Sequence, residues 1–553
     1  MKNSARLAVI ALSALSAPLA AQQAPRPASP SAPPKLIVAI SVDQFSADLF
    51  DEYRPHATGG FARLLQGAVF PNGYQSHAAT ETCPGHSTIL TGFRPEHTGI
   101  IANNWIDQKV TREDKTVYCA EDETVPGTSH DGGYTVSDKH LRVPTLGERM
   151  KTANSATRVV SVAGKDRAAV MMGGHKVDEL WWWDGKAFVS YTGRATPPVV
   201  ARANAATAAL IAKPQEALAA PDWCASHDKP VDIGQDPTGA HKTVGTGHFE
   251  RFAGDAKAFR ASPAFDASIV ALAAGLVQDM KLGRGQTTDI IDIGASATDY
   301  IGHTYGTEGA EMCIQLTQLD RTLGGLFRVL DATGVDYEVV LTADHGGNDL
   351  PEREVTAGIP EAKRVDVALA PANMGKAIAA KLGIAGRTLR GDIPNGDVWL
   401  DAALTPAQRT AVLAEAVAAY KAHPQVAAVF TAAQIGRSPE PSGPVENWTL
   451  LEKARASFDP SRSGDLLVFL KSRVTAIPGS LAGFVATHGS PWNYDRRVPI
   501  VFWRKGMAGF DHPGGVETVD IAPTLAAQIG LAMPKVDGKC LDLGAGRGAA
   551  CRR

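Results

Sequence analysis

Six side chains spread along the sequence have the chemistry of metal ligands. Three carboxylates and three imidazoles form a donor set that is well suited to zinc. A single residue of this kind is more often a satisfied structural group, but several such residues near strand ends together favour a metal cluster. The six are Asp43, Asp299, His303, Asp344, His345 and His488.

The spacing within this set allows the side chains to converge. Asp299 and His303 are four residues apart, so a helix would put both on one face, and a tight loop would also bring them together. Asp344 and His345 are adjacent, so both can bind only if the backbone turns there. The glycine pair at 346–347 supplies that freedom.

Thr82 begins the sequence TCPGHSTIL, in which Pro84 follows two residues later. Proline is favoured just inside a helix start, so we predict that Thr82 lies at or just before a helix N-terminus. Unpaired backbone N–H groups and the positive end of the helix dipole suit an anion at such a place. A hydroxyl whose pKa was lowered by a metal would be a nucleophile toward phosphate or sulfate there. The alternative is that Thr82 only caps the helix.

Apolar runs predict the strands that position these groups. The run 36–40 ends in Ser41-Val42-Asp43, as expected of a strand buried on both faces of a parallel sheet. Open α/β sheets place their sites at the carboxyl ends of such strands. Helical patches between the runs, such as 311–330, indicate an α/β fold with a largely parallel sheet. Further runs lie at 158–162, 289–293, 337–341 and 498–503.

Two regions interrupt this alternation and are predicted to be insertions that cap the carboxyl edge of the sheet. The first contains the Trp181–Trp183 triplet, for which buried packing is favoured over a substrate platform. The second contains a helix start with Thr405 as cap and Pro406 in the first turn. The predicted divisions are a signal peptide 1–21, a flexible leader 22–34, core parts 35–175, 266–350 and 461–553, and insertions 176–265 and 351–460.

The N-terminus has the pattern of an export signal. Lys2 and Arg6 precede a short apolar run, and small residues near Ala20 and Ala21 offer a cleavage site. No stretch is long and apolar enough to predict a membrane span. The mature protein is therefore expected to be periplasmic or extracellular; a retained N-terminal anchor is the alternative. The net charge of −3 does not indicate a nucleic-acid partner.

The six cysteines suit an oxidising compartment. They allow fifteen pairings, and the sequence does not choose among them. A bond between Cys540 and Cys551 is the simplest expectation, because it would hold the C-terminal tail. No cysteine spacing predicts a thiolate metal site.

Six ordered motifs resemble the alkaline phosphatase superfamily. The resemblance is to the branch with a single threonine nucleophile, which includes nucleotide pyrophosphatase/phosphodiesterases and secreted bacterial alkaline phosphatases. It implies a sandwich of a mostly parallel central sheet flanked by helices, with inserted cap regions. The motifs are SVDQF at 41–45, TETCPGHSTILTGFRPEHTGIIANN at 80–104, GKDRAA at 164–169, TDYIGHTYG at 298–306, TADHGG at 342–347 and HGS at 488–490.

The resemblance implies two zinc ions. Asp299, His303 and His488 would hold one of them, while Asp43, Asp344, His345 and the Thr82 oxygen would hold the other. Two metals about 4 Å apart can clamp the attacking and leaving oxygens of an in-line displacement. Asn103, preferred over its neighbour Asn104, would donate a hydrogen bond to a phosphoryl oxygen. A phosphothreonine formed on Thr82 and then hydrolysed would give net retention at phosphorus.

Lys165 and Arg167 in GKDRAA bear on the substrate class. Two cations favour a monoester dianion over a diester monoanion, and the resemblance associates this pair with monoester-specific members. The alternative is that both are solvated surface charges. The expected enzyme is thus an exported, zinc-dependent alkaline phosphatase for phosphate monoesters, with Thr82, Asn103, Lys165 and Arg167 as catalytic and substrate-binding residues.

Other functions stay open. A phosphodiesterase or nucleotide pyrophosphatase of the same fold is the main rival, and a secreted binding protein without catalysis is another. A sulfatase is disfavoured, because its C/S-x-P-x-R motif has no counterpart at 82–86. His77, His86 and His97 flank Thr82 but match no ligand position, so structural roles are expected. The natural substrate, the oligomeric state and an additional structural calcium are left undetermined.

Overall fold

Strand β1 (Leu36–Val42) lies in the middle of a ten-stranded sheet. The computed structural model describes residues 32–131, 133–235, 239, 241–479, 483–533, 535–544 and 551. β1 pairs in parallel with β10 (Asp289–Ala295) on one side and with β11 (Tyr337–Thr342) on the other. All seven β1 residues are buried, as the uninterrupted apolar run predicts.

The sheet is parallel at its centre and mixed at its edges. β5 (Val159–Ala163) and β6 (Glu179–Trp183) extend it in parallel beyond β10. β18 (Arg497–Arg504) pairs antiparallel with β11 and with β2 (Ala68–Tyr74), so the expected parallel alternation ends at β11. The order is β19 (Phe510–Asp511), β2, β18, β11, β1, β10, β5, β6, β7 (Phe188–Val189), with β20 (Val516–Glu517) also paired to β2.

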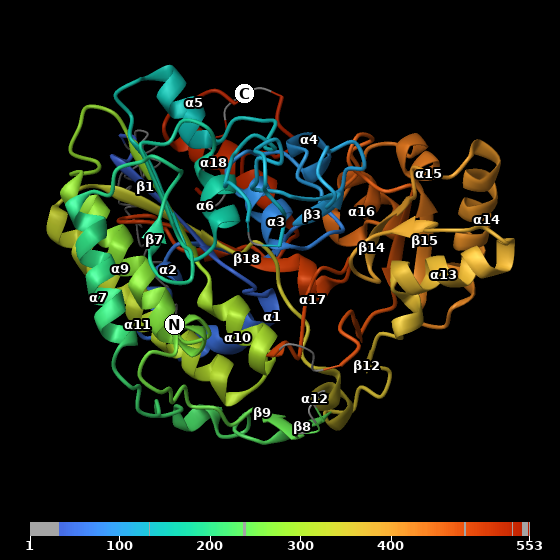
Figure 1. The fold of residues 1–553 in the computed structure, drawn as a ribbon. Coiled ribbons are helices and arrows are strands. Elements are labelled where there is room, and N and C mark those ends of the chain that lie inside the picture. The colour runs from blue at the N-terminus through green and yellow to red at the C-terminus, as the bar shows by residue number, and fades with distance from the viewer. Residues whose placement is uncertain are drawn as a thin grey trace, which may run out of the picture. The chain divides into compact units, whose positions relative to one another are not determined.

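Two helical layers cover the sheet, as Figure 1 shows. Leu36, Val38 and Ile40 of β1 share one apolar core with residues of α9 (Pro263–Asp279) and α11 (Ala310–Thr333). The alternate β1 residues, Ile37 and Ala39, share a second core with residues of α5 (Leu146–Ala153) and α18 (Ile521–Gln528). The sandwich implied by the resemblance is confirmed, because one strand contributes side chains to a core on each face.

A smaller sheet forms within the region 389–470. Its strands are β13 (Leu389–Arg390), β14 (Gly396–Leu400), β16 (Leu466–Leu470) and β15 (Val426–Thr431), in that spatial order. It shares an apolar core with α13 (Pro371–Leu382) and α14 (Pro406–Ala422). α14 begins at the predicted proline, with Thr405 as cap in a capping box. α15 (Ala432–Arg437) and α16 (Leu450–Ala456) complete this region.

The segment 190–260 contributes α7 (Pro198–Ile211), a hairpin of β8 (Val231–Gln235) and β9 (His241–Val244), and α8 (Ala256–Arg260). The Trp triplet precedes it in β6, and all three side chains are buried, so the packing prediction is confirmed. The predicted signal peptide and most of the leader lie outside the described residues. Within the described part of the chain, no helix combines the length and apolarity needed to cross a membrane.

The six cysteines form three disulfide bonds. The expected bond between Cys540 and Cys551 is confirmed. The others join Cys83 to Cys119 and Cys224 to Cys313. The Cys224–Cys313 bond attaches the segment 190–260 to α11, and the Cys83–Cys119 bond lies beside Thr82.

Candidate active site

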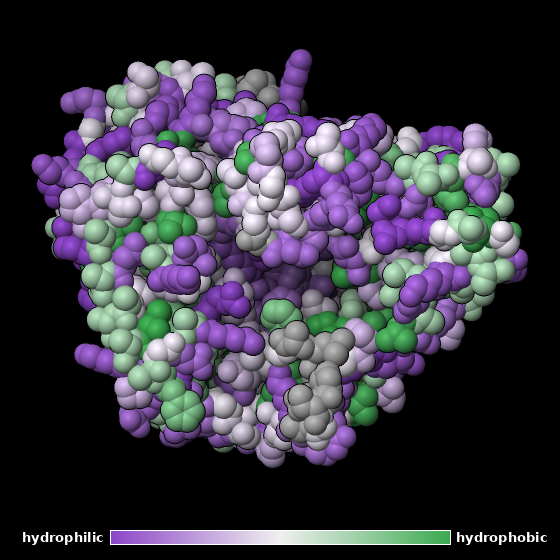
Figure 2. Space-filling view, in the orientation of Figure 1, coloured by the Kyte–Doolittle hydropathy of each residue, from purple (hydrophilic) through white to green (hydrophobic). Residues whose placement is uncertain are grey.

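Most of the predicted site residues gather at one edge of the central sheet. β1, β5, β10 and β11 are mutually parallel, so the segments that follow them emerge at the same edge. β18 is antiparallel, and its first residue, Arg497, pairs with Tyr74 at the end of β2. Segments that precede β18 or follow β2 therefore reach this edge too. Figure 2 shows that the face is hollowed around α3 (Thr82–Ile89) and α17 (Asn493–Arg496) and that hydrophilic residues line the hollow.

Two histidines meet the Asp299 carboxylate. Asp299 and His303 lie in α10 (Ala297–Tyr305), so the four-residue spacing puts them on one face of a helix. The Nε2 atoms of His303 and His488 are each 3.4 Å from Asp299 Oδ1. The rings of His488 and His345 stack with centroids 3.6 Å apart. His345 Nε2 lies 3.1 Å from Asp344 Oδ2.

Each of these histidines is oriented through its other ring nitrogen. The Nδ1 atoms of His303, His345 and His488 are 2.8–2.9 Å from the backbone carbonyls of Ala486, Gly346 and Thr80, respectively. A carbonyl can only accept, so each Nδ1 carries the donated proton. In a neutral ring the Nε2 lone pair is then free to bind a metal. A hydrogen bond from the second ring nitrogen to a backbone carbonyl is typical of metal-ligating histidines.

The turn after β1 helps to orient Asp344. Gln44 has φ of 63°, a left-handed conformation that is uncommon for a residue other than glycine. Its backbone N–H donates to Asp344 Oδ1 over 3.1 Å, and the backbone N–H of His345 donates to the same oxygen over 2.9 Å. Both bonds are made to Oδ1, and Oδ2 of Asp344 has no hydrogen-bond partner among the residues that the structure describes.

The site fits a metal because it contains buried polar atoms without hydrogen bonds. Leaving such atoms unpaired is costly, and bound cations would satisfy them. The ligand atoms of Asp299, His345 and His488 lie within 4.8 Å of one another, as do those of Asp43, His86 and Asp344. Among the described residues, the buried atoms without a hydrogen-bond partner include Asp43 Oδ1 and Oδ2, Thr82 Oγ1, Asp299 Oδ1, Asp344 Oδ2 and His345 Nε2.

His86 lies closer to this centre than the sequence indicated. Its ring is fully buried, with Nε2 3.4 Å from Asp43 Oδ1 and Nδ1 3.3 Å from Asp344 Oδ2. Nδ1 also lies 2.9 Å from the carbonyl of Thr82, one helical turn earlier. The signal in the sequence is that spacing, because it directs His86 along the same helix face as the nucleophile.

Lys165 lies between the two groups of candidate ligands. Its ammonium contacts Asp299 Oδ2 at 2.6 Å and Asp43 Oδ2 at 3.0 Å. Burial disfavours the charged form, but Asp299 and Asp43 together raise the pKa of Lys165 above its usual value. Burial also opposes ionisation of Asp299, yet Lys165 and the nearby histidines hold the pKa of that carboxyl well below its usual range. Lys165 is only 3% exposed, so the solvated-charge interpretation is wrong for this residue.

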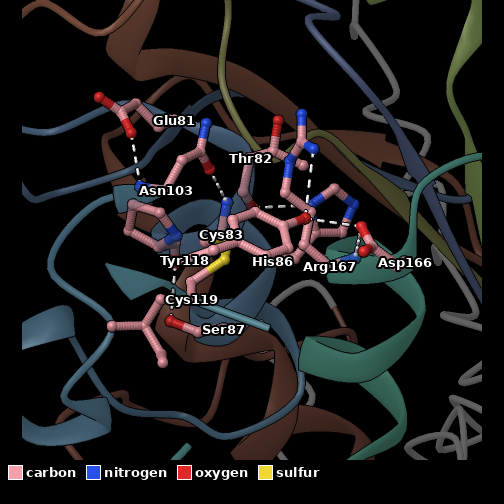
Figure 3. The surroundings of a disulfide bond; sticks show 12 residues. Glu81, Thr82, Cys83, His86, Ser87, Asn103, Tyr118, Cys119, Asp166 and Arg167 are labelled. Atoms are coloured by element: carbon pink, nitrogen blue, oxygen red, sulfur yellow. Dashed lines mark hydrogen bonds between the residues drawn. A yellow bond between two sulfur atoms is a disulfide. The ribbon is translucent and has the colours of Figure 1, made fainter. Parts of the chain in front are cut away.

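α3 begins at Thr82, as predicted, and the Thr82 side chain is buried. The expectation of unpaired N–H groups at this end needs correction. The N–H of Cys83 donates to Asn103 Oδ1 over 2.8 Å, and Pro84 has no N–H (Figure 3). An anion here could therefore use neither of these two positions, and the backbone N–H of Thr82 and nearby side chains remain for it.

Asn103 is held beside the start of α3. Because Oδ1 of Asn103 accepts from Cys83, its Nδ2 remains as the donor of the amide. The N–H of Asn103 donates to Glu81 Oε2 over 2.6 Å. Asn104 instead begins β3 (Asn104–Ile106), where it pairs with Tyr118 of β4 (Thr116–Tyr118). This placement agrees with the preference for Asn103.

Arg167 lies in the first turn of α6 (Asp166–Gly173). Its backbone N–H donates to Asp166 Oδ1 over 2.7 Å, and its guanidinium Nη1 donates to the hydroxyl of Tyr118 over 3.4 Å. The Tyr118 hydroxyl in turn donates to Asp166 Oδ1 over 2.6 Å. Sequence reasoning missed the contact between Tyr118 and Asp166, because no local pattern shows that two residues separated by 48 positions in the sequence meet.

Comparisons with known proteins show which chains and folds this protein is similar to. A family model described as type I phosphodiesterase / nucleotide pyrophosphatase matches residues 37–491. Alkaline phosphatase PhoK of a Sphingomonas species is 59% identical over 525 residues, which cover 94% of this chain and 93% of the relative. Alkaline phosphatase PhoD of Zymomonas mobilis is 46% identical over 522 residues, covering 94% and 89%. The crystal structure of alkaline phosphatase PafA matches the fold with a TM-score of 0.79 at 24% identity, over 92% of this chain and 98% of that one.

Proposed function

The chain belongs to the type I phosphodiesterase / nucleotide pyrophosphatase family of the alkaline phosphatase superfamily, and on that premise we propose that it is a zinc-dependent alkaline phosphatase. It would hydrolyse phosphate monoesters through a covalent phosphothreonine on Thr82. The relatives named PhoK and PhoD are both alkaline phosphatases and match nearly their whole length.

The observation that carries the monoester assignment is the pair of cations beside the nucleophile. Lys165 is buried against two candidate metal ligands, and Arg167 is held by Tyr118 and Asp166. A monoester dianion has no second ester group and presents more negative charge than a diester. Buried or partly buried cations therefore stabilise it preferentially, and the guanidinium can bind two of its oxygens at once.

The metal ligands follow from the donor set. Asp299, His303 and His488 would hold one zinc ion, and Asp43, Asp344, His345 and Thr82 Oγ1 would hold the other. When bound, two zinc ions lower the pKa of a hydroxyl or water and neutralise charge on the leaving oxygen. The contacts of His303 and His488 with Asp299 support the first set, and the contact of His345 with Asp344 supports the second. His345 also lies within 4.8 Å of the ligand atoms of Asp299 and His488, so it stands between the two proposed ions.

The chain's own residues then act on the phosphoryl group in two steps. Thr82 Oγ1 attacks phosphorus and releases the alcohol, and water later attacks the phosphothreonine and restores the hydroxyl. Asn103 Nδ2 would donate to one phosphoryl oxygen, while Arg167 would bind the others. Lys165 keeps a positive charge next to Asp43 and Asp299 throughout. Two successive in-line displacements predict net retention at phosphorus.

The first test compares kcat/KM for a monoester and a diester with the same leaving group. We expect a strong monoester preference. Arg167→Ala should lower monoester kcat/KM by roughly 10²–10³-fold, as removal of one charge-stabilising donor does elsewhere. Diester turnover should change much less. Preference for the diester would indicate a phosphodiesterase instead. Absence of turnover of both substrates would favour the binding-protein alternative.

A second test concerns the nucleophile. Thr82→Ala should abolish turnover, and it should also abolish the phosphorylated peptide containing residue 82 that we expect from the wild type. Thr82→Ser keeps a hydroxyl and should retain measurable turnover. Full activity in Thr82→Ala would refute the assignment. Zinc content and circular dichroism of both variants show whether a loss comes from the missing hydroxyl or from a disturbed site.

Export belongs to the same proposal. Lys2, Arg6 and the apolar run after them support it, and so do disulfides that require an oxidising compartment. N-terminal sequencing of the mature protein after expression with its own leader should find the first residue near position 22. A mature chain that begins at Met1 would contradict cleavage.

A further inference from the structure

The disulfide between Cys83 and Cys119 joins two residues that each follow a residue of the proposed site. Cys83 comes directly after Thr82, and Cys119 comes directly after Tyr118 (Figure 3). Both cysteines are completely buried. β3 and β4 form a two-stranded sheet of their own, separate from the ten-stranded sheet. The disulfide is thus a covalent link between this hairpin and the helix that begins at the nucleophile.

Asn103 is attached to both ends of the link. Its side-chain Oδ1 accepts from the N–H of Cys83 over 2.8 Å, and its backbone carbonyl accepts from the N–H of Cys119 over 2.9 Å. The separation of the two cysteines therefore determines where the Asn103 amide lies relative to Thr82. A shift of either cysteine would therefore move or break one of the two hydrogen bonds that hold Asn103.

Arg167 is attached through Tyr118. The guanidinium Nη1 donates to the Tyr118 hydroxyl, which donates in turn to Asp166 Oδ1. The disulfide sulfurs also belong to the same apolar cluster as Ala168 and Ala169 of α6, directly after Arg167. The hairpin thus contacts the arginine both through a hydrogen-bonded hydroxyl and through packing against its helix.

We propose that Cys83, Cys119 and Tyr118 are positioning residues that set the Thr82 nucleophile, the Asn103 amide and the Arg167 guanidinium in one geometry for a phosphoryl group. This inference rests on the proposed phosphatase function. The three groups come from three separate segments, and the disulfide ties the start of α3 to the end of the β3–β4 hairpin, to which Asn103 is hydrogen-bonded. Displacement by about 1 Å can lower a rate by roughly 10²-fold, so such a link matters for catalysis as well as for folding.

The test removes this disulfide and, as a control, another internal disulfide. Cys83→Ala/Cys119→Ala should lower kcat/KM for a phosphate monoester by roughly 10²-fold and weaken inhibition by inorganic phosphate. It should lower diester turnover less, because Arg167 discriminates between the substrates. The control, Cys224→Ala/Cys313→Ala, should keep the wild-type ratio of monoester kcat/KM to diester kcat/KM.

The control also separates geometry from stability. Its disulfide closes a longer loop, with a sequence separation of 89 against 36. The chain-entropy account of disulfides therefore predicts that its loss destabilises the fold at least as much. Thermal unfolding and zinc content should be measured for both double variants. A ratio that falls only in the Cys83/Cys119 variant supports positioning, whereas equal changes in both variants would overturn it.

A second pair of variants leaves the disulfide intact. Tyr118→Phe removes the hydroxyl that contacts Arg167, while Tyr134→Phe removes a neighbouring hydroxyl that donates to the other oxygen of the same carboxylate, Asp166 Oδ2, over 2.8 Å. We expect the monoester-to-diester ratio to fall about tenfold or more in Tyr118→Phe and to stay within about twofold in Tyr134→Phe, as loss of a charge-assisted contact implies. Equal ratios in the two variants would remove Tyr118 from the proposal.

The outcomes distinguish this inference from the proposed function. If the wild type does not turn over a monoester, the phosphatase proposal fails first. If the wild type prefers monoesters and the Cys83/Cys119 variant retains that preference together with its affinity for inorganic phosphate, only the positioning role is wrong.

Discussion

At the scale of single residues, the site places His86 in contact with two carboxylates, each of which follows the end of a different strand. The ring is fully buried between Asp43 and Asp344 and also contacts the carbonyl of Thr82. It therefore restrains the directions of two candidate ligands at once. Outer-shell partners of this kind contribute to metal affinity even when they do not bind the ion themselves.

His86→Ala should therefore weaken zinc retention by roughly 10–100-fold, the usual cost of losing an outer-shell partner. The measurement is the chelator concentration that removes half of the zinc, followed by elemental analysis. His241→Ala changes an exposed histidine of the β8–β9 hairpin and serves as the control. Unaltered retention in His86→Ala would show that Asp43 and Asp344 are oriented without the ring.

Residue types and order predicted which groups would gather, but not all of their contacts. Asp43, Asp299, Asp344 and the histidines follow from the motifs, because strand ends in a parallel sheet share an edge. The contact of Lys165 with two ligand carboxylates depends on how far its side chain reaches across the edge, and no local pattern encodes this. Six cysteines allow fifteen connectivities, and no feature of the sequence singled out those that contain a Cys83–Cys119 bond.

At the scale of elements, α3 packs unusually close to the turn that carries Asp344. A Cβ atom added at Gly85 would lie 2.0 Å from the Asp344 carbonyl oxygen, so only glycine fits there. Gly325 in α11 contrasts with it, because the nearest atom to an added Cβ is the far end of Arg328 at 3.7 Å. The same substitution at the two positions therefore has opposite expected effects.

Gly85→Ala should destabilise the protein by roughly 1–3 kcal/mol, because overpacking forces α3 and the Asp344 turn apart. Gly325→Ala should instead be neutral or stabilise by up to about 1 kcal/mol, as alanine favours a helix interior. Chemical denaturation checks both free energies of unfolding. Zinc content shows whether the turn that carries Asp344 has been displaced. An unchanged free energy of unfolding in Gly85→Ala would mean that α3 can move away from the Asp344 turn without loss of stability.

The N-terminus of α5 carries a pH-sensitive contact. Glu148 forms a capping box with Thr145, and His175 Nδ1 lies 3.0 Å from Glu148 Oε1. That hydrogen bond raises the pKa of His175 to about 9, from 6.5 in an unfolded chain. A raised pKa in the folded state means that its stabilisation is complete below pH 6.5 and is lost as the pH rises through 9.

Wild-type Tm should therefore fall between pH 6.5 and pH 9 by more than the Tm of His175→Asn, which lacks the titrating ring. The difference between the two curves should be largest below pH 6.5 and close to zero above pH 9. His241→Asn should follow the wild-type curve. Parallel curves for the wild type and His175→Asn would show that the Glu148 contact adds no stability.

The predictable elements were those with long apolar runs or clear caps. β1 begins with five consecutive apolar residues, β10 and β11 are mostly apolar although Asp292 and Glu338 lie within them, and α14 has both a cap and a first-turn proline. The direction of β18 was not predictable, because direction depends on the connection before it and not on its own residues. Its antiparallel pairing with β11 became evident only in three dimensions.

At the scale of the whole molecule, the smaller sheet and the core share buried contacts. Arg455 of α16 forms an ion pair with Glu96, whose side chain is 2% exposed. Ala78, four residues before Thr82, shares an apolar cluster with Phe469 of β16 and Ala454 of α16. Asn395 Nδ2 donates to the carbonyl of Gly489 over 2.8 Å, next to His488. The two regions are therefore expected to unfold together.

Glu96→Ala should destabilise the protein by roughly 3 kcal/mol, because it leaves the Arg455 guanidinium partly buried without its main partner. Glu440→Ala is the control, because it removes an exposed carboxylate that contacts the same arginine at 3.9 Å. This contact should contribute less than about 1 kcal/mol. Hydrogen exchange at β11 and β16 should report one shared opening in the wild type. Separate openings would show that the smaller sheet unfolds on its own.

The position of β1 has a consequence for how the chain is made. Leu36 pairs with Asp289 and with Tyr337, so the first strand of the sheet finds both neighbours only after more than half of the chain has been synthesised. Pairing over such separations makes folding slow and leaves apolar strands exposed in the meantime. A nascent chain of this topology emerges without its central sheet, which is compatible with the proposed export, because a chain that crosses a membrane unfolded would form its sheet afterwards.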